Sequence, residues 1–406
     1  MQYAADQAMQ AGFERIEGRP GYRHPLYSDV MAEADPTADA ATTPYVQGMF
    51  IALDPFNGQV RAMIGGRDFE HSKFDRARQA RRQAGSTFKT FVFAAALEGG
   101  LPASHIVADA PIVRTESDGS EWRPRNFDAE FHGDMTLREA YRRSINMVAI
   151  RLGDEEVGLE TVAQTARRFG VNSPIPRVPS MPIGATDLLP MEMAEAYSTF
   201  AALGTKVRPF PILRVENAQG DTLWEPQPER VQVMDAQTAR LMVSMMEDVV
   251  DGANGTGGRI RSESGLPREV PAAGKTGTTN NRTDVWFVGF TPTLQAAVWF
   301  GMDRPMQIYP NATGGADAAP VFGDFMRRVY VGDEEANGGG EPLLPIPQRW
   351  PMGDLASLEV DNRTGLLASR WCPADRRYTE YFIPGTEPTE ECDDSSDGRR
   401  TPRWPW

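Results

Sequence analysis

Histidine and cysteine are scarce in this chain of 406 residues. The two cysteines and four histidines are scattered, and their spacing does not indicate a metal cluster. The shortage of histidine, together with the lack of a Gly-x-Ser-x-Gly sequence, also argues against a Ser-His-Asp hydrolase. We therefore expect a protein that uses neither a metal nor another cofactor. The histidines are His24, His71, His105 and His132.

Long apolar runs and basic clusters are missing as well. No apolar stretch approaches the ~20 residues that cross a bilayer, and the N-terminus lacks the apolar core of a signal peptide. The net charge of −14 and the lack of any basic run argue against a nucleic-acid-binding surface. The remaining composition, 40% hydrophobic and 24% charged, is typical of a globular protein with a large core.

Lysine is rare too, because 38 of the 42 basic residues are arginine. Arginine keeps its proton in a protein, whereas a buried lysine can lose it. Lys89 follows Ser86 by three residues, and the apolar stretch that follows predicts a helix over 87–98, with Ser86 as its N-cap and Gly99-Gly100 at its end. A neutral lysine there could take the proton of Ser86 and make it a nucleophile. A capped core helix could also carry this pair by chance.

Two further stretches combine polar side chains with regular structure. Residues 136–152 predict one amphipathic helix capped by Thr136, and this helix contains Ser144-Ile145-Asn146. Residues 270–279 predict a strand of small residues with Lys275 on one face and Thr276 and Thr278 on the other. Such a strand is often a surface strand end, but its small residues also allow another chain to lie against it.

The rest of the chain predicts both helices and strands. A hairpin is expected at 46–53 and 59–64, two strands at 285–290 and 296–301, a strand pair within 208–225, and a short pair within 355–388. Residues 20–44 read as an irregular connector, and 331–345 as a flexible exit from the last core helix. Further helices are expected at 2–17, 158–170, 190–203, 235–251 and 318–331.

The three polar stretches together resemble the motifs of the penicillin-recognising serine transferases, which are Ser-x-x-Lys, Ser-x-Asn and Lys-Thr-Gly in this order. The surrounding sequence narrows the resemblance to the transpeptidase domain of class A penicillin-binding proteins, closely over about 45–330. Positions 75 and 84 depart from it, since the family more often has asparagine and proline there. The segments that carry the resemblance are 74–77, 82–86, 136–138, 274–279 and 284–289.

The resemblance implies an α/β fold of the α+β type. An antiparallel five-stranded sheet covered by helices would lie beside an all-helical subdomain, with the active site in the cleft between them. We expect the transpeptidase domain at 45–331, a linker at 1–44 of the kind that follows a glycosyltransferase domain, and a C-terminal extension at 332–406. Class A proteins also carry that glycosyltransferase domain and a membrane anchor. We therefore expect the chain to be one half of a longer protein at the periplasmic face of a bacterial inner membrane.

The resemblance also implies the catalytic roles. Ser86 would attack the D-Ala-D-Ala bond of a peptidoglycan stem peptide, release D-alanine and form an acyl-enzyme. Lys89 would be the base, Ser144 would relay the proton to the leaving amine, and the Lys275 ammonium would keep Lys89 neutral. An amine of a neighbouring stem would then form the cross-link. A β-lactam would imitate the donor and stay attached to Ser86.

Substrate-binding roles follow from the same motifs. Asn146 would bind an amide of the substrate, and Thr276, Gly277 and Thr278 would form the binding strand, with the two threonine hydroxyls on the terminal carboxylate. The backbone N–H groups of Ser86 and Thr278 would form the oxyanion hole.

Other functions of this motif set stay open from the sequence. A D,D-carboxypeptidase or β-lactamase passes the acyl group to water, and a β-lactam-sensing domain acylates once and signals. No residue resembles the deacylating glutamate of a class A β-lactamase, and no transmembrane signalling segment is visible. Cys372 and Cys392 are 20 residues apart, and they would form a disulfide in an oxidising compartment or stay free thiols otherwise.

Overall fold

The computed structural model describes residues 1–35, 39–115, 119–332 and 340–392. In this part of the chain, five antiparallel strands form one sheet in the order β13-β14-β15-β1-β2. The pairing of β1 with β15 joins the N-terminal hairpin to the three later strands, which confirms the predicted sheet. The strands are β1 (Gln47–Leu53), β2 (Val60–Ile64), β13 (Ala273–Thr278), β14 (Asp284–Phe290) and β15 (Gln295–Gly301).

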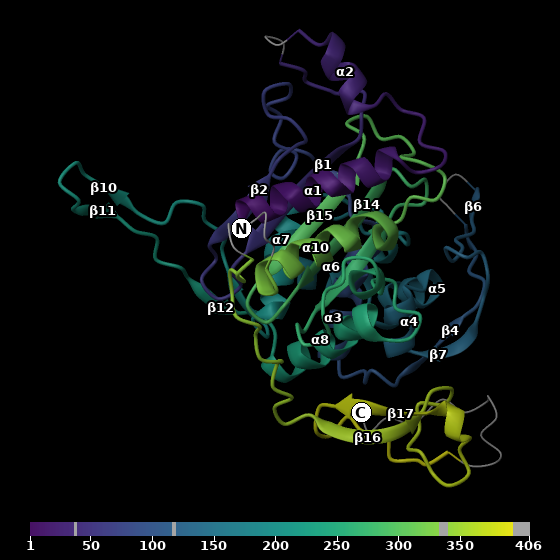
Figure 1. Ribbon diagram of the computed structural model, residues 1–406. Helices are drawn as coiled ribbons and strands as arrows, with labels where there is room; N and C mark the ends of the chain where they lie inside the picture. Colours follow the sequence, from purple (N-terminus) through teal and green to yellow (C-terminus); the bar gives the residue numbers. More distant parts are fainter. Residues whose placement is uncertain (36–38, 116–118, 333–339, 393–406) are drawn as a thin grey trace.

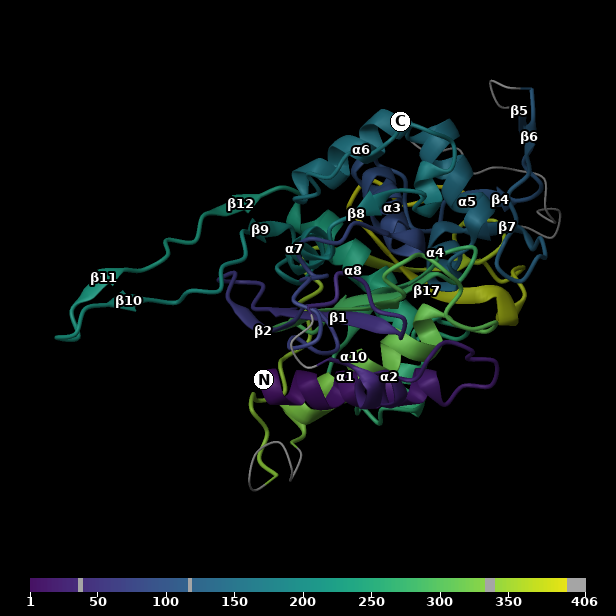
Figure 2. The ribbon, with the colours of Figure 1, turned by 90° about the horizontal axis from the view of Figure 1, so that it is seen from above.

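Alternating side chains send the two faces of this sheet into two separate cores. In β14, Trp286 and Val288 belong to a core shared with the helices of one face, whereas Val285 and Phe287 belong to a core under α1 (Gln2–Glu17) and α10 (Ala319–Tyr330). Figure 2 shows the resulting layers, with α1 and α10 on one side of β1. On the other side lie α3 (Lys89–Glu98), α6 (Leu159–Arg168), α7 (Pro190–Ala201) and α8 (Ala236–Asp251). The sheet therefore separates a thin helical cover from a larger helical subdomain, as the resemblance predicts.

Most of the predicted helices and strand pairs are present. The helices are α1 (Gln2–Glu17), α2 (Tyr27–Glu33), α3 (Lys89–Glu98), α4 (Leu137–Arg143), α5 (Asn146–Ile150), α6 (Leu159–Arg168), α7 (Pro190–Ala201), α8 (Ala236–Asp251), α9 (Arg259–Ser262) and α10 (Ala319–Tyr330). Shorter turns are η1 (Gly85–Phe88), η2 (Arg151–Glu156), η3 (Met181–Ile183), η4 (Gly314–Ala318) and η5 (Ala374–Arg376).

In the part of the chain that the structure describes, six two-stranded sheets lie outside the five-stranded sheet. They are β3 (Arg82–Gln83) with β8 (Asp187–Leu188), β4 (Ile106–Asp109) with β7 (Gly133–Thr136), β5 (Arg114–Thr115) with β6 (Glu121–Trp122), β9 (Thr205–Val207) with β12 (Arg230–Gln232), β10 (Val215–Glu216) with β11 (Thr222–Trp224), and β16 (Ala356–Asp361) with β17 (Arg377–Phe382). The β10–β11 hairpin projects from the body as an arm in both ribbon views (Figures 1 and 2).

Two predicted segments differ from the structure, and two others fall on residues that it does not describe. The connector at 20–44 contains the short helix α2. The stretch 136–152 is not one helix, because α4 ends at Ser144 and α5 starts after it; the reason is given below with the site. The predicted exit from α10 falls largely on 333–339, and the end of the C-terminal extension on 393–406; both lie outside the described residues.

The N-terminal helix packs tightly on the domain. Ala5, Ala8 and Phe13 of α1 are buried in the core that contains Phe300 and Val321, and the ring of Phe13 meets that of Phe300 edge-on with centroids 5.3 Å apart. The domain boundary at 45 stays a prediction, although this helix shares the core of the domain that follows it.

A buried ion pair fixes the C-terminal strands to the helical subdomain. Arg138 in α4 donates to both oxygens of Glu380 in β17, at 2.5 and 2.8 Å, and to Asp248 in α8 at 2.9 Å. The Glu380 side chain is fully buried. Figure 1 shows β16 and β17 as a separate layer beyond α8 and the α4–β7 region, so this pair joins two distinct parts of the fold.

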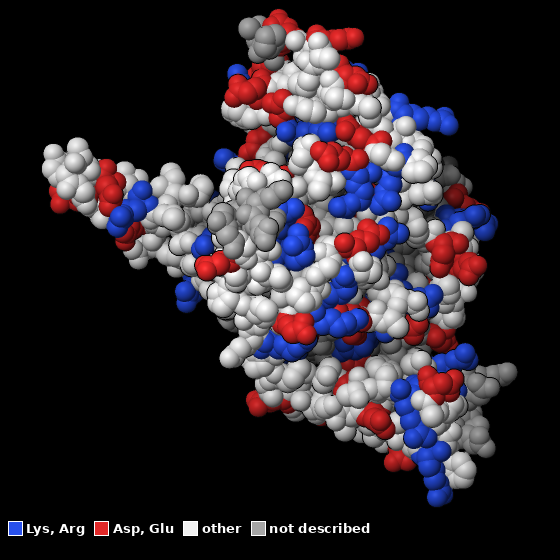
Figure 3. Space-filling model, in the orientation of Figure 1, with Lys and Arg blue, Asp and Glu red and all other residues white. Residues whose placement is uncertain are grey.

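The C-terminal strands also hold both cysteines close together. The Cα atoms of Cys372 and Cys392 are 5.9 Å apart, a distance that a disulfide spans without backbone movement. On the face shown in Figure 3, basic and acidic side chains are interspersed over the body and over these strands. No large basic region is visible on that face, in agreement with the net charge.

Removing one member of the buried pair should destabilise the fold. Glu380→Ala leaves the buried Arg138 guanidinium with Asp248 as the remaining one of its two carboxylate partners, and we expect a loss of about 3–5 kcal/mol in the free energy of unfolding. Urea denaturation measures this loss. Glu359→Ala, on the exposed face of the neighbouring strand β16, is the matched control and should change stability by less than about 0.5 kcal/mol. Equal losses in the two variants would show that the ion pair does not anchor these strands.

Candidate active site

Ser86 lies in a 3-10 turn that leads directly into α3. This turn, η1, covers Gly85–Phe88, and α3 begins at Lys89. The prediction of Ser86 as N-cap is therefore wrong, since the turn begins at Gly85 with Ala84 in the capping position and the serine lies inside it. Among the described residues, none forms a hydrogen bond with the Ser86 hydroxyl, which lines an open cleft. The hydroxyl is thus available for chemistry instead of capping.

Buried polar contacts position the chain just before Ser86. Arg82 donates to Asp284 at 2.8 Å, and its guanidinium lies 4.7 Å from the centre of the Trp299 ring. The indole of Trp286 donates to the carbonyl of Gln83 at 3.0 Å. Both contacts come from the central strands of the sheet, so the sheet itself fixes the direction in which the turn leaves β3.

Glycines allow the turn to approach its neighbours closely. Gly85 has φ +53, a left-handed conformation, and a Cβ there would lie 3.1 Å from the carbonyl oxygen of Thr278. On the opposite side, the amide of Gly85 donates to the carbonyl of Gly184 at 3.1 Å, and a Cβ on Gly184 would overlap the carbonyl of Gly85. The backbone around Ser86 is therefore enclosed between β13 and η3.

Lys89, Ser144 and Lys275 come together from three distant segments. The Lys89 amine donates to the Ser144 carbonyl at 2.6 Å and to Asn146 Oδ1 at 2.7 Å. The Lys275 amine donates to Ser144 Oγ at 2.8 Å and to the Thr276 carbonyl at 3.1 Å. Ser144 Oγ also lies 3.3 Å from Lys89 Nζ. One serine hydroxyl thus lies between two lysine amines, as the sequence motifs predict.

Burial changes the protonation of both lysines. Neither lysine has solvent-exposed surface. Desolvation, followed by the charge of Lys275, lowers the pKa of Lys89 well below its usual value. Desolvation lowers the pKa of Lys275 to about 7. Burial therefore favours the neutral form of Lys89, which is the form that can accept a proton. The amine lies within hydrogen-bond distance of the Ser144 carbonyl, Ser144 Oγ and Asn146 Oδ1.

Ser144 stands at a break between two helices, and this break explains why the predicted single helix is wrong. Ser144 adopts the left-handed conformation (φ 59, ψ 41) and Ile145 is extended, so α4 ends and α5 restarts at Asn146. The predicted cap at the other end of α4 is confirmed, because Thr136 Oγ1 accepts from the amide of Glu139 at 3.2 Å. The break turns the Ser144 carbonyl and hydroxyl toward the two lysines, which a continuous helix could not do.

The edge strand β13 forms one wall of the cleft. Thr276 and Thr278 both line it, while Lys275 is buried behind them. Thr276 Oγ1 lies 2.7 Å from Thr256 Oγ1, and Thr278 Oγ1 accepts from the amide of Gly314 at 3.0 Å. Gly277 does not line the cleft. A Cβ there would lie 2.8 Å from Thr87 Cγ2, so this glycine lets β13 pack on the Ser86 turn, and its predicted substrate contact stays a prediction.

The opposite wall contains residues that the sequence analysis did not single out. Residues 122–127 line the cleft and include the buried Asn126. Its Oδ1 accepts from the amide of Asn146 at 2.9 Å, and its Nδ2 donates to Asp109 at 2.8 Å. Asn146 Nδ2 in turn donates to the carbonyl of Arg125 at 2.8 Å. This stretch has no periodicity of its own, so nothing in the single sequence marked it as part of the site.

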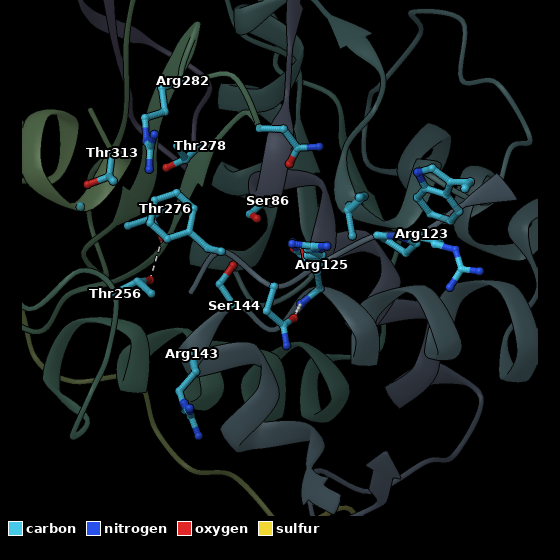
Figure 4. Close-up of a pocket in the computed structure, with 18 residues that line it drawn as sticks. Ser86, Arg123, Arg125, Arg143, Ser144, Thr256, Thr276, Thr278, Arg282 and Thr313 are labelled. Carbon is cyan, nitrogen blue, oxygen red and sulfur yellow. Dashed lines mark hydrogen bonds between the residues drawn. The ribbon is translucent and has the colours of Figure 1, made fainter. Parts of the chain in front are cut away.

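The cleft is polar and has a volume of about 540 Å³. Figure 4 shows Ser86 in its middle, with Thr276 and Thr278 on one side and Arg125 on the other, and with Ser144 close by. A serine hydroxyl without a hydrogen-bond partner among the described residues, a buried amine with a lowered pKa and a second serine are groups that acyl transfer can use.

This geometry defines the class of the protein, and comparison with known families agrees. A family model described as the penicillin-binding protein transpeptidase domain matches residues 48–327, which is more than half of the chain. The chain therefore belongs to this family of penicillin-binding transpeptidases. A second model, described as the C-terminal domain of penicillin-binding protein 1A, matches residues 353–397 and so covers β16 and β17.

The relatives point to one branch of the family. The chain is 41% identical to penicillin-binding protein 1A of Neisseria lactamica over 297 residues, which is 71% of this chain and 36% of that protein. It is 34% identical to penicillin-binding protein 1A of Pseudomonas aeruginosa over 405 residues, 87% of this chain and 47% of that protein. The chain thus spans less than half the length of these relatives.

Solved structures share the fold. Penicillin-binding protein 1A from Haemophilus influenzae matches with a TM-score of 0.75 and 26% identity, over 86% of this chain and 55% of that one. PonA1 from Mycobacterium tuberculosis in complex with penicillin V matches with a TM-score of 0.64 and 24% identity, over 86% and 87% of the two chains, which is a likeness of fold. Within the described residues, no helix has the length and apolar character needed to cross a membrane.

The two lysines should make acylation by penicillin depend on pH in a defined way. The second-order acylation rate should rise as Lys89 loses its proton, and it should fall again as Lys275 loses its proton with an apparent pKa near 7. Stopped-flow or gel-based labelling between pH 5 and 10 measures both limbs. In Lys275→Arg the basic limb should move up by at least about two pH units, because arginine keeps its proton. If the acylation rate fell at the same pH in the native protein and in Lys275→Arg, deprotonation of Lys275 would not be the cause of that fall.

Proposed function

We propose that the chain is a serine D,D-transpeptidase domain that cross-links peptidoglycan stem peptides. The observation that carries this proposal is the fully buried Lys89 one helical turn after Ser86, whose amine contacts Ser144 and Asn146 and whose pKa is lowered by burial. An amine that can lose its proton, in the same site as a serine hydroxyl without a hydrogen-bond partner among the described residues, is what nucleophilic catalysis needs. Membership of the transpeptidase family supports the same reaction.

In the first half-reaction, Ser86 Oγ attacks the carbonyl carbon of the D-Ala-D-Ala bond and its proton passes to Lys89 Nζ. The oxyanion would be held by the backbone N–H groups of Ser86 and Thr278, which lie on two segments in close contact. The C–N bond then breaks, Ser144 delivers a proton to the leaving amine, and D-alanine departs. Ser86 is left as an ester of the donor peptide.

In the second half-reaction, an amine of a neighbouring stem peptide attacks this ester and releases Ser86. Thr276 and Thr278 would hold the terminal carboxylate of the donor before it leaves, and Asn146 would hold an amide of the donor. Lys275, whose amine donates to Ser144 Oγ, would assist Ser144. A β-lactam would acylate Ser86 by the same attack, but its ring-opened amine stays attached and blocks the second step.

The lining of the cleft favours transfer to an amine over transfer to water. Among the described residues that line it, there is no aspartate or glutamate that could activate a water molecule. This supports a transpeptidase over a carboxypeptidase or a β-lactamase. The relatives named penicillin-binding protein 1A further support a parent protein with a glycosyltransferase domain and a membrane anchor, acting outside the cytoplasm.

The assignment of nucleophile and base is tested by labelling with a fluorescent penicillin. The native protein should be labelled covalently at Ser86, and Ser86→Ala should stay folded and unlabelled. Lys89→Arg keeps a long basic side chain but cannot give up its proton and so removes the proton acceptor, and its acylation rate should fall by at least ~10³-fold. Labelling that persists in Ser86→Ala would refute the nucleophile, and a Lys89→Arg rate within about tenfold of the parent would refute the base.

The choice between transfer and hydrolysis is tested with a thioester or stem-peptide donor. Adding a D-amino acid or a stem peptide with a free amine should divert most of the product from free acid to amide, as measured by mass spectrometry. The penicillin adduct should persist for many minutes because no activated water attacks it. A product that remains mostly acid at saturating acceptor would instead identify the chain as a hydrolase.

A further inference from the structure

The cleft is basic although the chain as a whole is acidic. The chain carries 56 acidic and 42 basic residues, yet the cleft is lined by four arginines and, within the described residues, by no carboxylate. Opposite walls lined with one sign of charge raise the local concentration of ligands of the other sign. The cleft therefore favours an anionic ligand; its arginines are Arg123, Arg125, Arg143 and Arg282.

Two of the four arginines already have carboxylate partners. Arg123 binds Glu121 at 2.6 Å, and Arg143 binds Glu139 at 3.1 Å. Within the described residues, Arg125 and Arg282 form no such pair. Both of these are free to bind a carboxylate that comes from outside the chain.

Two backbone hydrogen bonds and the ring of Phe127 hold Arg282 in place. It belongs to the turn between β13 and β14, where its amide donates to the carbonyl of Thr279 at 2.8 Å and its carbonyl accepts from Ile308 at 3.0 Å. Its guanidinium lies over the Phe127 ring, 5.3 Å from the ring centre. Its Nε is shielded from solvent and has no hydrogen-bond partner. A charged group with an unused buried donor is expected to bind an acceptor when a ligand covers it.

Arg125 stands on the opposite wall. Its backbone carbonyl accepts a hydrogen bond from the side-chain amide of Asn146, which fixes the backbone of Arg125 next to the Ser144–Asn146 motif. Its side chain is exposed in the cleft. In Figure 4, Arg282 lies beyond Thr278 and Arg125 lies on the other side of Ser86. A donor peptide acylated at Ser86 would run between these two guanidinium groups.

The proposed reaction does not use these arginines. The terminal carboxylate of the donor is assigned to Thr276 and Thr278, and it departs with D-alanine. A carboxylate that these arginines hold on the acylated donor would therefore belong to the rest of the donor peptide. Guanidinium groups bind carboxylates through paired N–H donors, and these bonds are stronger than bonds to a neutral amide.

We propose that Arg125 and Arg282 bind a side-branch carboxylate of the donor peptide, upstream of the bond that Ser86 cleaves. The site thereby prefers donors whose branch carboxyl is free over donors in which it is amidated. This inference rests on the proposed transpeptidase function, because it identifies the chemical class of its donor.

Two synthetic donors test the preference directly. Both end in D-Ala-D-Ala and differ only in one upstream side branch, a free carboxylate in one and a primary carboxamide in the other. For the native protein, kcat/KM should be at least about tenfold higher for the carboxylate donor. If the values of kcat/KM for the two donors differed by less than about twofold, the inference would be overturned. This measurement uses the native protein alone, so its result does not depend on the folding of a variant.

Variants locate the preference in the structure. In Arg125→Gln combined with Arg282→Gln, the ratio of the two donors should fall to within about twofold of one. Arg123→Gln is the matched control from the same loop, and its ratio should stay that of the native protein because Glu121 already occupies this arginine. A preference that persists in the double variant would overturn the assignment to these residues.

Penicillin labelling separates this inference from the function on which it rests. A native protein that is labelled at Ser86 but treats both donors alike retains the proposed function and loses the donor preference. A native protein that is not labelled at Ser86 loses the proposed function itself.

Discussion

Two buried lysines that share one serine are the constraint on which this structure depends. Lys89 and Lys275 are both fully buried, and within the described residues neither forms an ion pair. Burying an amine without a counter-charge is unfavourable unless the amine gives up its proton. The surrounding fold must therefore be stable enough to hold these groups in a dry place. The helix α3 is buried along nearly its whole length, which supplies part of that stability.

The chain treats its buried arginines in the opposite way. Arg76, Arg82 and Arg138 are each buried and each paired with a carboxylate, respectively Asp303, Asp284 and Glu380. Arginine cannot lose its proton, so a buried arginine needs a partner, whereas a lysine can become neutral. Among these buried side chains, permanent charge thus joins the parts of the fold, and the two lysines that can lose their charge lie at the site.

The sequence predicted the sheet, most of the helices and the family, because these depend on local periodicity and on three ordered motifs. It did not predict the break at Ser144, because the pattern of apolar residues continues through 136–152 while the left-handed backbone of one serine interrupts it. It placed Ser86 at a helix cap, one step away from its true position inside a 3-10 turn. The wall at 122–127 was missed altogether, because irregular backbone held by Asn126 and Asp109 has no period that a single sequence can reveal.

The tight packing around the nucleophile turn bears on how the site can change over generations of antibiotic exposure. A side chain at Gly184 or Gly277 would collide with Gly85 or Thr87, so heritable change on either side of the turn displaces Ser86 itself. The stretch 122–127 is different, because Arg123, Arg125 and Phe127 are exposed. Substitutions that reshape the cleft without moving the nucleophile are therefore expected in this stretch, above all at Arg123, which is paired with Glu121 and lies outside the proposed donor contacts.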